Sequence, residues 1–227
     1  MHPDQLETET APSNSTSPGV RATAVVVPVR ALEGAKSRLG EVLDAEERRE
    51  LVELLLRRTL DAARGVPGVS VVAVVSPDLA ALAVARSAGA EPIVQHSLGL
   101  NAGLVEARAT LAGRADRMLI VPADLPMITA ADLTAMLSLA DAAVPRGRHL
   151  VVLAPDRHGR GTNALLLEPP GVIEPSFGGE SRSVHESLAA AAGAAYVELA
   201  GRLELDVDTP DDLLMVEANR PDALHAH

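Results

Sequence analysis

The sequence predicts a single α/β domain in which a mostly parallel sheet is covered by helices on both faces. Two observations carry this prediction. Short apolar runs alternate with longer helical segments, and several of these runs are continuously apolar, as in strands that are buried on both faces. A chain of 227 residues, of which 47% are hydrophobic, is long enough to form one such domain around its own core.

The first half of the chain alternates regularly between the two kinds of segment. Residues 22–29 (ATAVVVPV) form the first expected strand, and Asp44 with Glu47 gives a capping-box start to a long amphipathic helix that ends at Arg64. Further strands are expected at 69–75, 91–95 and 117–121, and further helices at 78–88, 101–112 and 129–139.

The second half is less regular but continues the same pattern. We expect strands at 150–154, 162–167, 195–199 and 203–207, and helices at 181–192 and 209–218. No internal repeat or linker divides the chain, so one domain is expected over 21–218. Residues 1–20 are polar and lack the basic start and apolar stretch of a signal peptide, which predicts a disordered tail, and 219–227 are expected to form a C-terminal tail.

Composition excludes several classes of function. A net charge of −11 argues against a general binder of nucleic acid or of anionic membranes, and an aromatic content of 1% leaves few rings for stacking on bases. No apolar run has the length of a membrane span. The absence of cysteine excludes disulfides and thiolate chemistry, and it fits a cytoplasmic protein.

A cluster of basic residues follows the first expected strand, in PVRALEGAKSRL. Arg30, Lys36 and Arg38 lie close together there, and Lys36 is the single lysine among twenty basic residues. Cations in such a loop suit a nucleoside triphosphate, because they offset its charge and that of a pyrophosphate leaving group. The loop matches neither a P-loop nor a dinucleotide fingerprint. An ordinary solvated turn remains the alternative.

Acidic residues lie near the carboxyl ends of two other expected strands. Asp124 comes directly after 117–121, within PADLP, and Asp206 and Asp208 lie two residues apart, so that on a strand they would face the same side. Carboxylates held at the ends of strands are suitable ligands for Mg²⁺, and we expect these three to form one metal centre. The alternative is that they are turn or capping residues. Structural roles at the start of the last helix are expected for Thr209, Pro210, Asp211 and Asp212.

Two glycine-containing loops are candidates for an anion site. GRGTNALLL places Thr162 and Asn163 at the start of a strand, and FGGES places Gly178, Gly179 and Ser181 just before a helix. Backbone N–H groups in such a loop, together with the helix N-terminus, can bind a carboxylate or a phosphate. A flexible surface turn is the alternative.

Two further polar residues allow opposite interpretations. Asn101 could read a nucleotide base edge, or it could cap the helix that begins nearby. The seven histidines show no metal-ligand spacing, and His185, within an expected helix, is interpreted as a surface or packing residue. Neither Ser37 nor Ser181 belongs to a Ser-His-Asp pattern, which argues against a hydrolase.

Taken together, the motifs resemble those of the 2-phospho-L-lactate and phosphoenolpyruvate guanylyltransferases, which supply an activated intermediate for coenzyme F-420. The resemblance covers residues 22–214 and rests on six stretches that occur in the family's order: PVRALEGAKSRL, LGLNAGL, PADLP, GRGTNALLL, FGGES with His185 after it, and DVDTPDDL. Each stretch alone is a weak match, and the six in order are a strong one.

This resemblance implies a nucleotidyltransferase fold, GTP, Mg²⁺ and a phosphorylated three-carbon acid, either phosphoenolpyruvate or 2-phospho-L-lactate. It implies that the acid contacts Thr162, Gly178 and Ser181, and that the three aspartates serve the metal. A transferase of the same pathway would then use the product. Two alternatives stay open: a relative that uses another nucleotide or acceptor, whose opening loop is usually glycine-rich, and a non-catalytic nucleotide-binding regulator of the same fold.

Overall fold

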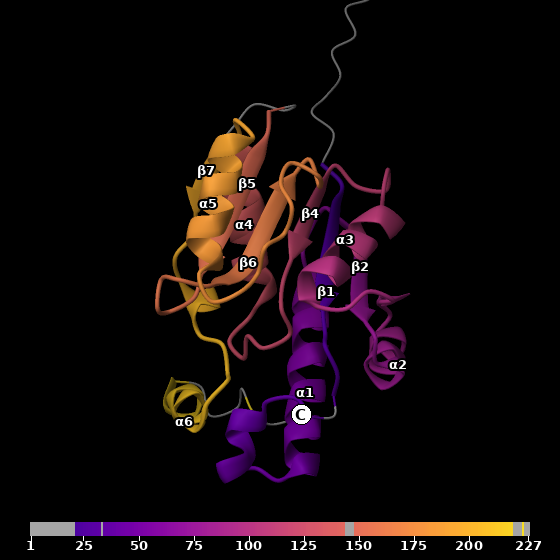
Figure 1. Cartoon of the computed structure of the whole chain (residues 1–227), viewed down its shortest axis with the longest axis vertical. Helices are drawn as coiled ribbons and strands as arrows, with labels where there is room; N and C mark the ends of the chain where they lie inside the picture. The colour runs from indigo at the N-terminus through magenta and orange to yellow at the C-terminus, as the bar shows by residue number, and fades with distance from the viewer. Residues whose placement is uncertain (1–20, 33, 144–147, 220–223, 225–227) are drawn as a thin grey trace, which may run out of the picture.

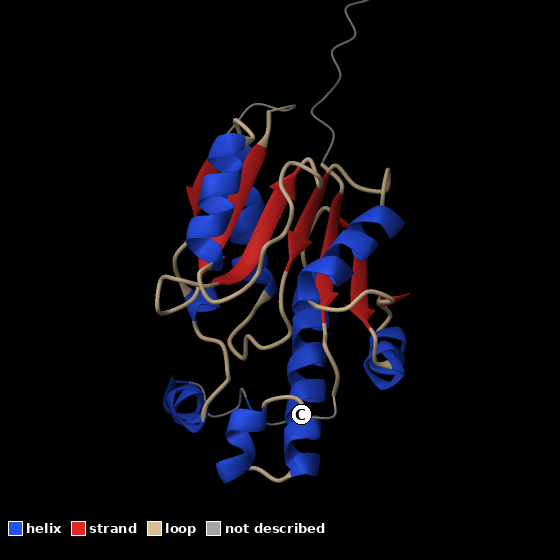
Figure 2. Ribbon diagram, viewed as in Figure 1, coloured by secondary structure: helices blue, strands red, loops and turns tan. Residues whose placement is uncertain are grey.

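A computed structural model of the chain describes residues 21–32, 34–143, 148–219 and 224. These residues form one seven-stranded sheet with the strand order β3-β2-β1-β4-β6-β5-β7, flanked by helices (Figures 1 and 2). The expected tail at 1–20 lies outside the described residues, as does most of the tail at 219–227. Leu224, which is described, packs against a hydrophobic cluster.

Six of the seven strands run in the same direction. β1 pairs in parallel with β2 and β4, β2 pairs in parallel with β3, and β5 pairs in parallel with β7, whereas β6 is antiparallel to both β4 and β5. The predicted, mostly parallel sheet is therefore confirmed. The strands are β1 (Thr23–Pro28), β2 (Val69–Ser76), β3 (Glu91–Val94), β4 (Arg117–Ile120), β5 (Leu150–Pro155), β6 (Thr162–Glu168) and β7 (Ala195–Glu198).

Helices cover both faces of this sheet. Buried residues of α1, α2 and α4 share one hydrophobic cluster, and those of α3 and α5 share another, so the two groups lie on opposite faces. In Figure 1, α3 and α5 cross in front of the strands. The helices are α1 (Ala45–Arg64), α2 (Leu79–Ser87), α3 (Leu100–Thr110), α4 (Ala130–Ala143), α5 (Ser181–Ala191) and α6 (Pro210–Asn219), and two 3₁₀ helices are η1 (Ser37–Glu41) and η2 (Arg202–Glu204).

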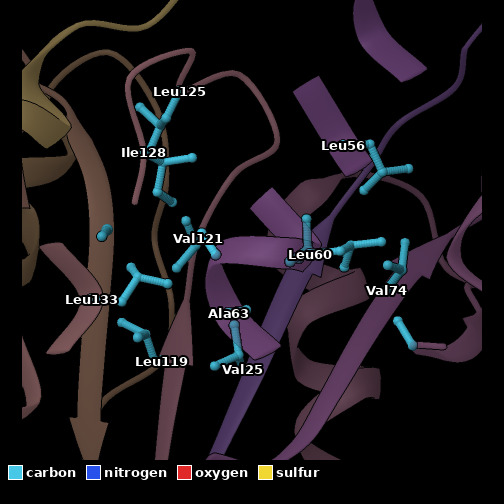
Figure 3. Close-up of a cluster of buried hydrophobic side chains, with 14 of the residues drawn as sticks. Val25, Leu56, Leu60, Ala63, Val74, Leu119, Val121, Leu125, Ile128 and Leu133 are labelled. Atoms are coloured by element: carbon cyan, nitrogen blue, oxygen red, sulfur yellow. The ribbon is translucent and has the colours of Figure 1, made fainter. Parts of the chain in front are cut away.

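The core explains why the strands are continuously apolar. Successive side chains of β1 point to opposite faces, so Val25 joins the cluster under α1 and Val26 joins the cluster under α3, and both are fully buried. Figure 3 shows Val25 beside Ala63 of α1, with Leu60 of the same helix next to Val74 of β2. A strand that is buried on both faces needs apolar residues at every position.

Local capping fixes where two helices begin, and the sequence predicts the first of these caps, at Asp44. The Asp44 carboxylate accepts from the backbone N–H of Glu47, and the Glu47 carboxylate accepts from that of Asp44. At the start of α4, the Asp132 carboxylate likewise accepts from the backbone N–H of Thr129. Each arrangement satisfies N–H groups that the first turn of a helix leaves unpaired.

One expected strand is absent. Residues 203–207 form no strand in the structure: η2 covers the first two of them, and the other three have no regular structure. Leu203 and Val207 are buried, so the apolar alternation that suggests a strand reflects burial alone. The argument that Asp206 and Asp208 share one face of a strand is therefore wrong.

The strand order creates a crevice beside β1. From β1 the chain moves to β2 and β3 on one side, and it then returns to β4 on the other. Ligands of open α/β sheets bind at such a switch point, outside the carboxyl ends of the strands. Because β6 runs in the opposite direction, its first residues, Thr162 and Asn163, lie at this same edge.

Candidate active site

A cavity of about 570 Å³ opens at the carboxyl ends of β1 and β4. Its walls come from segments far apart in the sequence: the loop after β1, the turn after β4, the start of β6, the turn before α5 and the segment before α6. Most of the candidate site residues line it, namely Arg30, Lys36, Asp124, Thr162, Asn163, Gly178, Gly179, Ser181, Asp206 and Asp208.

Three carboxylates converge on one side of the cavity. Asp124, Asp206 and Asp208 each offer an oxygen, and these three atoms lie within 4.8 Å of one another. The turn after β4 and the segment before α6 are joined through their main chains, because the backbone N–H of Val207 donates to the backbone carbonyl of Asp124 at 3.0 Å. The cluster could hold a metal ion, since carboxylate oxygens are the preferred ligands of hard divalent cations.

The ammonium of Lys36 also contacts this cluster. Its Nζ lies 2.7 Å from Oδ1 of Asp208 and 3.3 Å from Oδ2 of Asp124. Lys36 adopts a left-handed backbone conformation, with φ 53° and ψ 40°, which a residue with a side chain rarely adopts. The loop after β1 therefore turns sharply at the residue whose side chain reaches the carboxylates.

Burial and charge act against each other at these groups. Burial raises the pKa of Asp206, and the negative charge of Asp124 raises it further. For Lys36, burial favours the neutral form, but the charges of Asp124 and Asp208 outweigh it, so that the pKa of Lys36 is raised. A set of carboxylates that repel one another and are only partly neutralised by one ammonium fits a divalent cation.

The two arginines of the basic loop differ in position. Arg30 is exposed, lines the cavity, and has no hydrogen bond or ion pair with any residue that the structure describes. Arg38 is exposed on η1 and is not part of the cavity lining. The structure thus brings Arg30 and Lys36 to the cavity but leaves Arg38 outside it, and a role for Arg38 stays a prediction.

The opposite side of the cavity carries hydroxyl groups. The Thr162 and Ser181 side chains are buried, and their oxygens lie 3.0 Å apart. Behind them, Nδ1 of His185 lies 3.1 Å from the Thr162 hydroxyl, and Nε2 of His185 accepts from the backbone N–H of Ser176 at 2.9 Å. These groups form a continuous hydrogen-bonded chain from the wall of the cavity into α5.

The glycine loop lies beside these hydroxyls. A Cβ atom added to Gly178 or Gly179 would meet nothing within 4 Å, and neither residue has a positive φ. Neither packing nor backbone conformation therefore requires glycine there. At the start of α5 no side chain caps the first turn, but the backbone N–H of Ser181 donates to the carbonyl of Gly178 and that of Arg182 donates to the carbonyl of Arg160. The start of α5 therefore favours an anion mainly through the positive end of the helix dipole.

Two asparagines position this site through their amides. The Asn101 side-chain amide donates from Nδ2 to the backbone carbonyl of Phe177, and its Oδ1 accepts from the backbone N–H of the same residue, which precedes the glycine loop. Gly99 is the N-cap of α3, so Asn101 is not the cap, and base reading by Asn101 stays a prediction. Asn163 donates to the carbonyls of Leu203 and Glu204, and it thereby supports the segment that carries Asp206 and Asp208.

Sequence reasoning missed one residue at this site and part of the role of two others. Asp156 lines the cavity, and its position after β5 could have been inferred from the strand that precedes it. His185 is fully buried and contacts Phe177 edge to face, so it is a packing residue as expected, but one with two hydrogen bonds. Asp212 caps α6 as expected, and it also holds the backbone of Asp208, which no sequence pattern indicates.

The chain is similar to known proteins over most of its length. Residues 23–220 match the family described as guanylyl transferase CofC like. The chain is 45% identical over 197 residues to a phosphoenolpyruvate guanylyltransferase of Rubrobacter xylanophilus, covering 86% of this chain and 93% of that protein. It is 44% identical over 202 residues to that of Sphaerobacter thermophilus, covering 88% and 94%.

The fold is also shared with a solved structure. A protein from Desulfovibrio desulfuricans that is assigned to the nucleotide-diphospho-sugar transferases superposes with a TM-score of 0.68 at 16% identity, covering 88% of this chain and 87% of that one. The expected nucleotidyltransferase fold is thereby confirmed. With the match over residues 23–220 and these relatives, the chain belongs to the CofC-like family of guanylyl transferases.

Proposed function

We propose that this protein transfers GMP from GTP to the phosphate of phosphoenolpyruvate, with release of pyrophosphate. The observation that carries the proposal is one cavity with two chemically different sides: a carboxylate cluster with cations on one side, and a hydroxyl and glycine-loop anion site on the other. The guanylyl donor and the acid acceptor follow from the names of the relatives. 2-Phospho-L-lactate is the alternative acceptor.

The carboxylate side suits the triphosphate. Asp124, Asp206 and Asp208 would hold Mg²⁺, which would offset negative charge on the reacting phosphates. Arg30 extends from the loop at the mouth of the cavity, where it is free to contact a phosphate, and Lys36 adds a second cation. Arg38 contributes positive charge from outside the cavity.

The hydroxyl side suits the acid. The hydrogen-bonded pair of Thr162 and Ser181 can donate to a carboxylate or phosphate oxygen, and the positive end of the α5 dipole favours negative charge. Gly178 and Gly179 let the main chain approach the ligand closely, because no side chain projects from them. Asn163 supports the adjoining wall.

The proposed reaction is an in-line displacement at phosphorus. A phosphate oxygen of the acid forms a new bond to the α-phosphorus of GTP, and the bond from that phosphorus to the bridging oxygen of pyrophosphate breaks. The attacking oxygen is already anionic, so no general base is required. The side chains therefore contribute by positioning both substrates and by neutralising charge. The product is enolpyruvyl-diphospho-guanosine.

The cellular location that we propose rests on the composition of the sequence. A cysteine-free chain fits the cytoplasm, and the net charge of −11 gives no reason to invoke nucleic acid. None of the helices in the described part of the chain combines the length and apolarity that a bilayer crossing requires. A transferase that accepts an activated diphosphate would consume the product.

The test is pyrophosphate release from each of GTP, ATP and CTP, with phosphoenolpyruvate, 2-phospho-L-lactate or a sugar phosphate as acceptor. The proposal expects release with GTP and phosphoenolpyruvate together, at a higher kcat/KM than with any other pair. A higher value with another pair would assign the protein to another transfer reaction. Binding of GTP without turnover on any acceptor would indicate a regulator.

Two matched variants locate the metal centre. Asp208→Asn removes one carboxylate from the cluster and should lower turnover at limiting Mg²⁺ by about 10²-fold or more. Asp211→Asn removes the same charge from an exposed position three residues away and should leave turnover unchanged. Equal turnover in the two variants would contradict the assignment of Asp208 to the metal.

A further inference from the structure

A buried histidine lies behind the hydroxyl side of the cavity. His185 is 0% exposed, although it lies in an otherwise amphipathic helix, and its ring packs edge to face against Phe177 at 5.4 Å between centroids. Both of its nitrogens have partners, Ser176 at Nε2 and Thr162 at Nδ1. Burial lowers its pKa to about 4, so the ring is neutral at neutral pH.

The partner at Nε2 determines which nitrogen carries the proton. The backbone N–H of Ser176 can only donate, so Nε2 must accept and cannot carry a hydrogen. A neutral imidazole has one N–H, which is then at Nδ1 and points to the Thr162 hydroxyl. The Thr162 oxygen is therefore an acceptor in this contact.

The same reasoning shows how many hydrogens the Thr162 and Ser181 hydroxyls can still donate. Thr162 and Ser181 together have two O–H hydrogens, and the contact between their oxygens uses one of them. The His185 contact uses none, because Nδ1 supplies its own hydrogen. One hydroxyl hydrogen is left, and neither oxygen has another acceptor among the described residues.

We propose that His185 is a positioning residue whose Nδ1–H holds the Thr162–Ser181 pair so that it presents one O–H donor to the cavity. The inference rests on the proposed function, in that the ligand which accepts this donor is an anionic oxygen of the acid substrate. If Nδ1 were instead an acceptor, Thr162 would turn its hydrogen away from the cavity and toward the ring.

The His185 ring also connects the hydroxyl donor with the glycine loop. Ser176 and Phe177, which His185 contacts, directly precede Gly178 and Gly179, and Asn101 holds Phe177 from the side of α3. The orientation of the hydroxyls and the position of the loop are thus set by one side chain. This gives a physical reason for a polar ring at a position where an apolar one would fill the space.

The first experiment observes the proton directly. The ¹⁵N shifts of the His185 ring in the full-length protein distinguish the two neutral tautomers, and its resonances are identified by ring-to-ring NOE contacts with Phe177, the single phenylalanine of the sequence. We expect Nδ1 to be protonated and Nε2 to be unprotonated at pH 7. A ring protonated at Nε2, or a charged ring, would overturn the proposal whatever the enzyme's activity.

The second experiment uses three substitutions that differ in what they retain. An asparagine at this position can place an N–H near the site of Nδ1, a glutamine can reach the site of Nε2, and a leucine supplies neither. His185→Leu and His185→Gln should raise KM for phosphoenolpyruvate by about tenfold or more, with KM for GTP little changed. His185→Asn should restore much of the loss.

The outcomes separate this inference from the proposed function. If the wild-type protein does not use phosphoenolpyruvate with GTP, the proposed function fails, while the ¹⁵N shifts still test the hydrogen-bond direction. If the wild type is active but all three variants raise both KM values equally, His185 has a structural role only. Thermal unfolding of each variant shows whether the fold is retained, and the wild-type ¹⁵N measurement needs no variant to fold.

Discussion

The carboxylate of Asp212 accepts a hydrogen bond from the backbone N–H of Asp208 at 2.9 Å. The same oxygen accepts from the backbone N–H of Thr209 at 2.8 Å, and the other oxygen pairs with Arg157. Burial disfavours this charge, but the hydrogen bonds outweigh it, and the pKa of Asp212 is lowered. A capping residue of α6 thus sets the main chain of a candidate metal ligand.

Substitution of this residue should affect both stability and turnover. Asp212→Ala leaves the N–H groups of Asp208 and Thr209 without their acceptor, which should lower the free energy of unfolding by about 1–3 kcal/mol. Because Asp208 is then less well held, turnover at limiting Mg²⁺ should fall by about tenfold or more. Urea unfolding and steady-state kinetics measure the two effects.

The start of α4 offers a matched control for this experiment. Asp132 accepts from the backbone N–H of Thr129 in the same capping geometry, but it is not part of the cavity lining. Asp132→Ala should cost about 1 kcal/mol of stability and leave turnover unchanged. Full turnover in Asp212→Ala would restrict that residue to helix capping.

The ammonium of Lys36 can be removed without strain on the main chain. Glycine adopts the left-handed conformation of this residue freely, so Lys36→Gly should keep the fold. Its loss of positive charge beside the reacting phosphates should lower turnover by about 10²-fold or more. Steady-state kinetics, with circular dichroism as a check on folding, measure this.

Arg38 in the same loop provides the comparison. It is exposed on η1 outside the cavity lining, where solvent and salt screen its charge. Arg38→Ala should therefore lower turnover by no more than about threefold. Equal losses in the two variants would mean that the total charge of the loop matters and that the contact of Lys36 with the carboxylates does not.

Some of this architecture follows directly from sequence patterns. Continuous apolar runs such as 24–27 predict strands, because only a strand that is buried on both faces excludes polar residues at every position. Residues 203–207 show the limit of the method. Their alternation is produced by the burial of Leu203 and Val207, while the backbone bonds to Asp124 and to Asn163 instead of to a neighbouring strand.

The site shows a similar limit. The meeting of Asp124 with Asp206 and Asp208 could be predicted, although the strand that suggests it is absent and a main-chain bond from Val207 to Asp124 joins the two segments instead. The hydrogen bonds of His185 could not be predicted, because its partners come from the start of β6 and from the loop before α5. No spacing within α5 encodes partners that only tertiary packing supplies.

His185 should also make stability depend on pH. Burial lowers its pKa from 6.5 to about 4, so between these values the unfolded chain binds a proton that the folded protein does not. The stability linked to the neutral ring is complete above pH 6.5 and is lost as pH falls toward 4. From pH 7 to pH 5 the wild type should lose about 2 kcal/mol more than His185→Asn does. Urea unfolding measures both losses. Equal losses of unfolding free energy in the wild type and in His185→Asn would contradict the lowered pKa of His185.

The last prediction concerns the glycine loop, where alanine separates binding from stability. A Cβ at Gly178 would meet nothing within 4 Å, and no positive φ strains it, so Gly178→Ala should keep the melting temperature or raise it slightly. Because Gly178 lines the cavity, the methyl group should enter space that the acid needs. We expect KM for phosphoenolpyruvate to rise by about tenfold, with KM for GTP little changed.

Gly171 is the matched control for this substitution. It has the same open surroundings and no positive φ, but it lies outside the lining of this cavity. Gly171→Ala should therefore leave both KM values and the melting temperature near those of the wild type. A wild-type KM for phosphoenolpyruvate in Gly178→Ala would show that the acid does not approach the main chain of this loop, and the anion site would then have to lie on the Thr162 side alone.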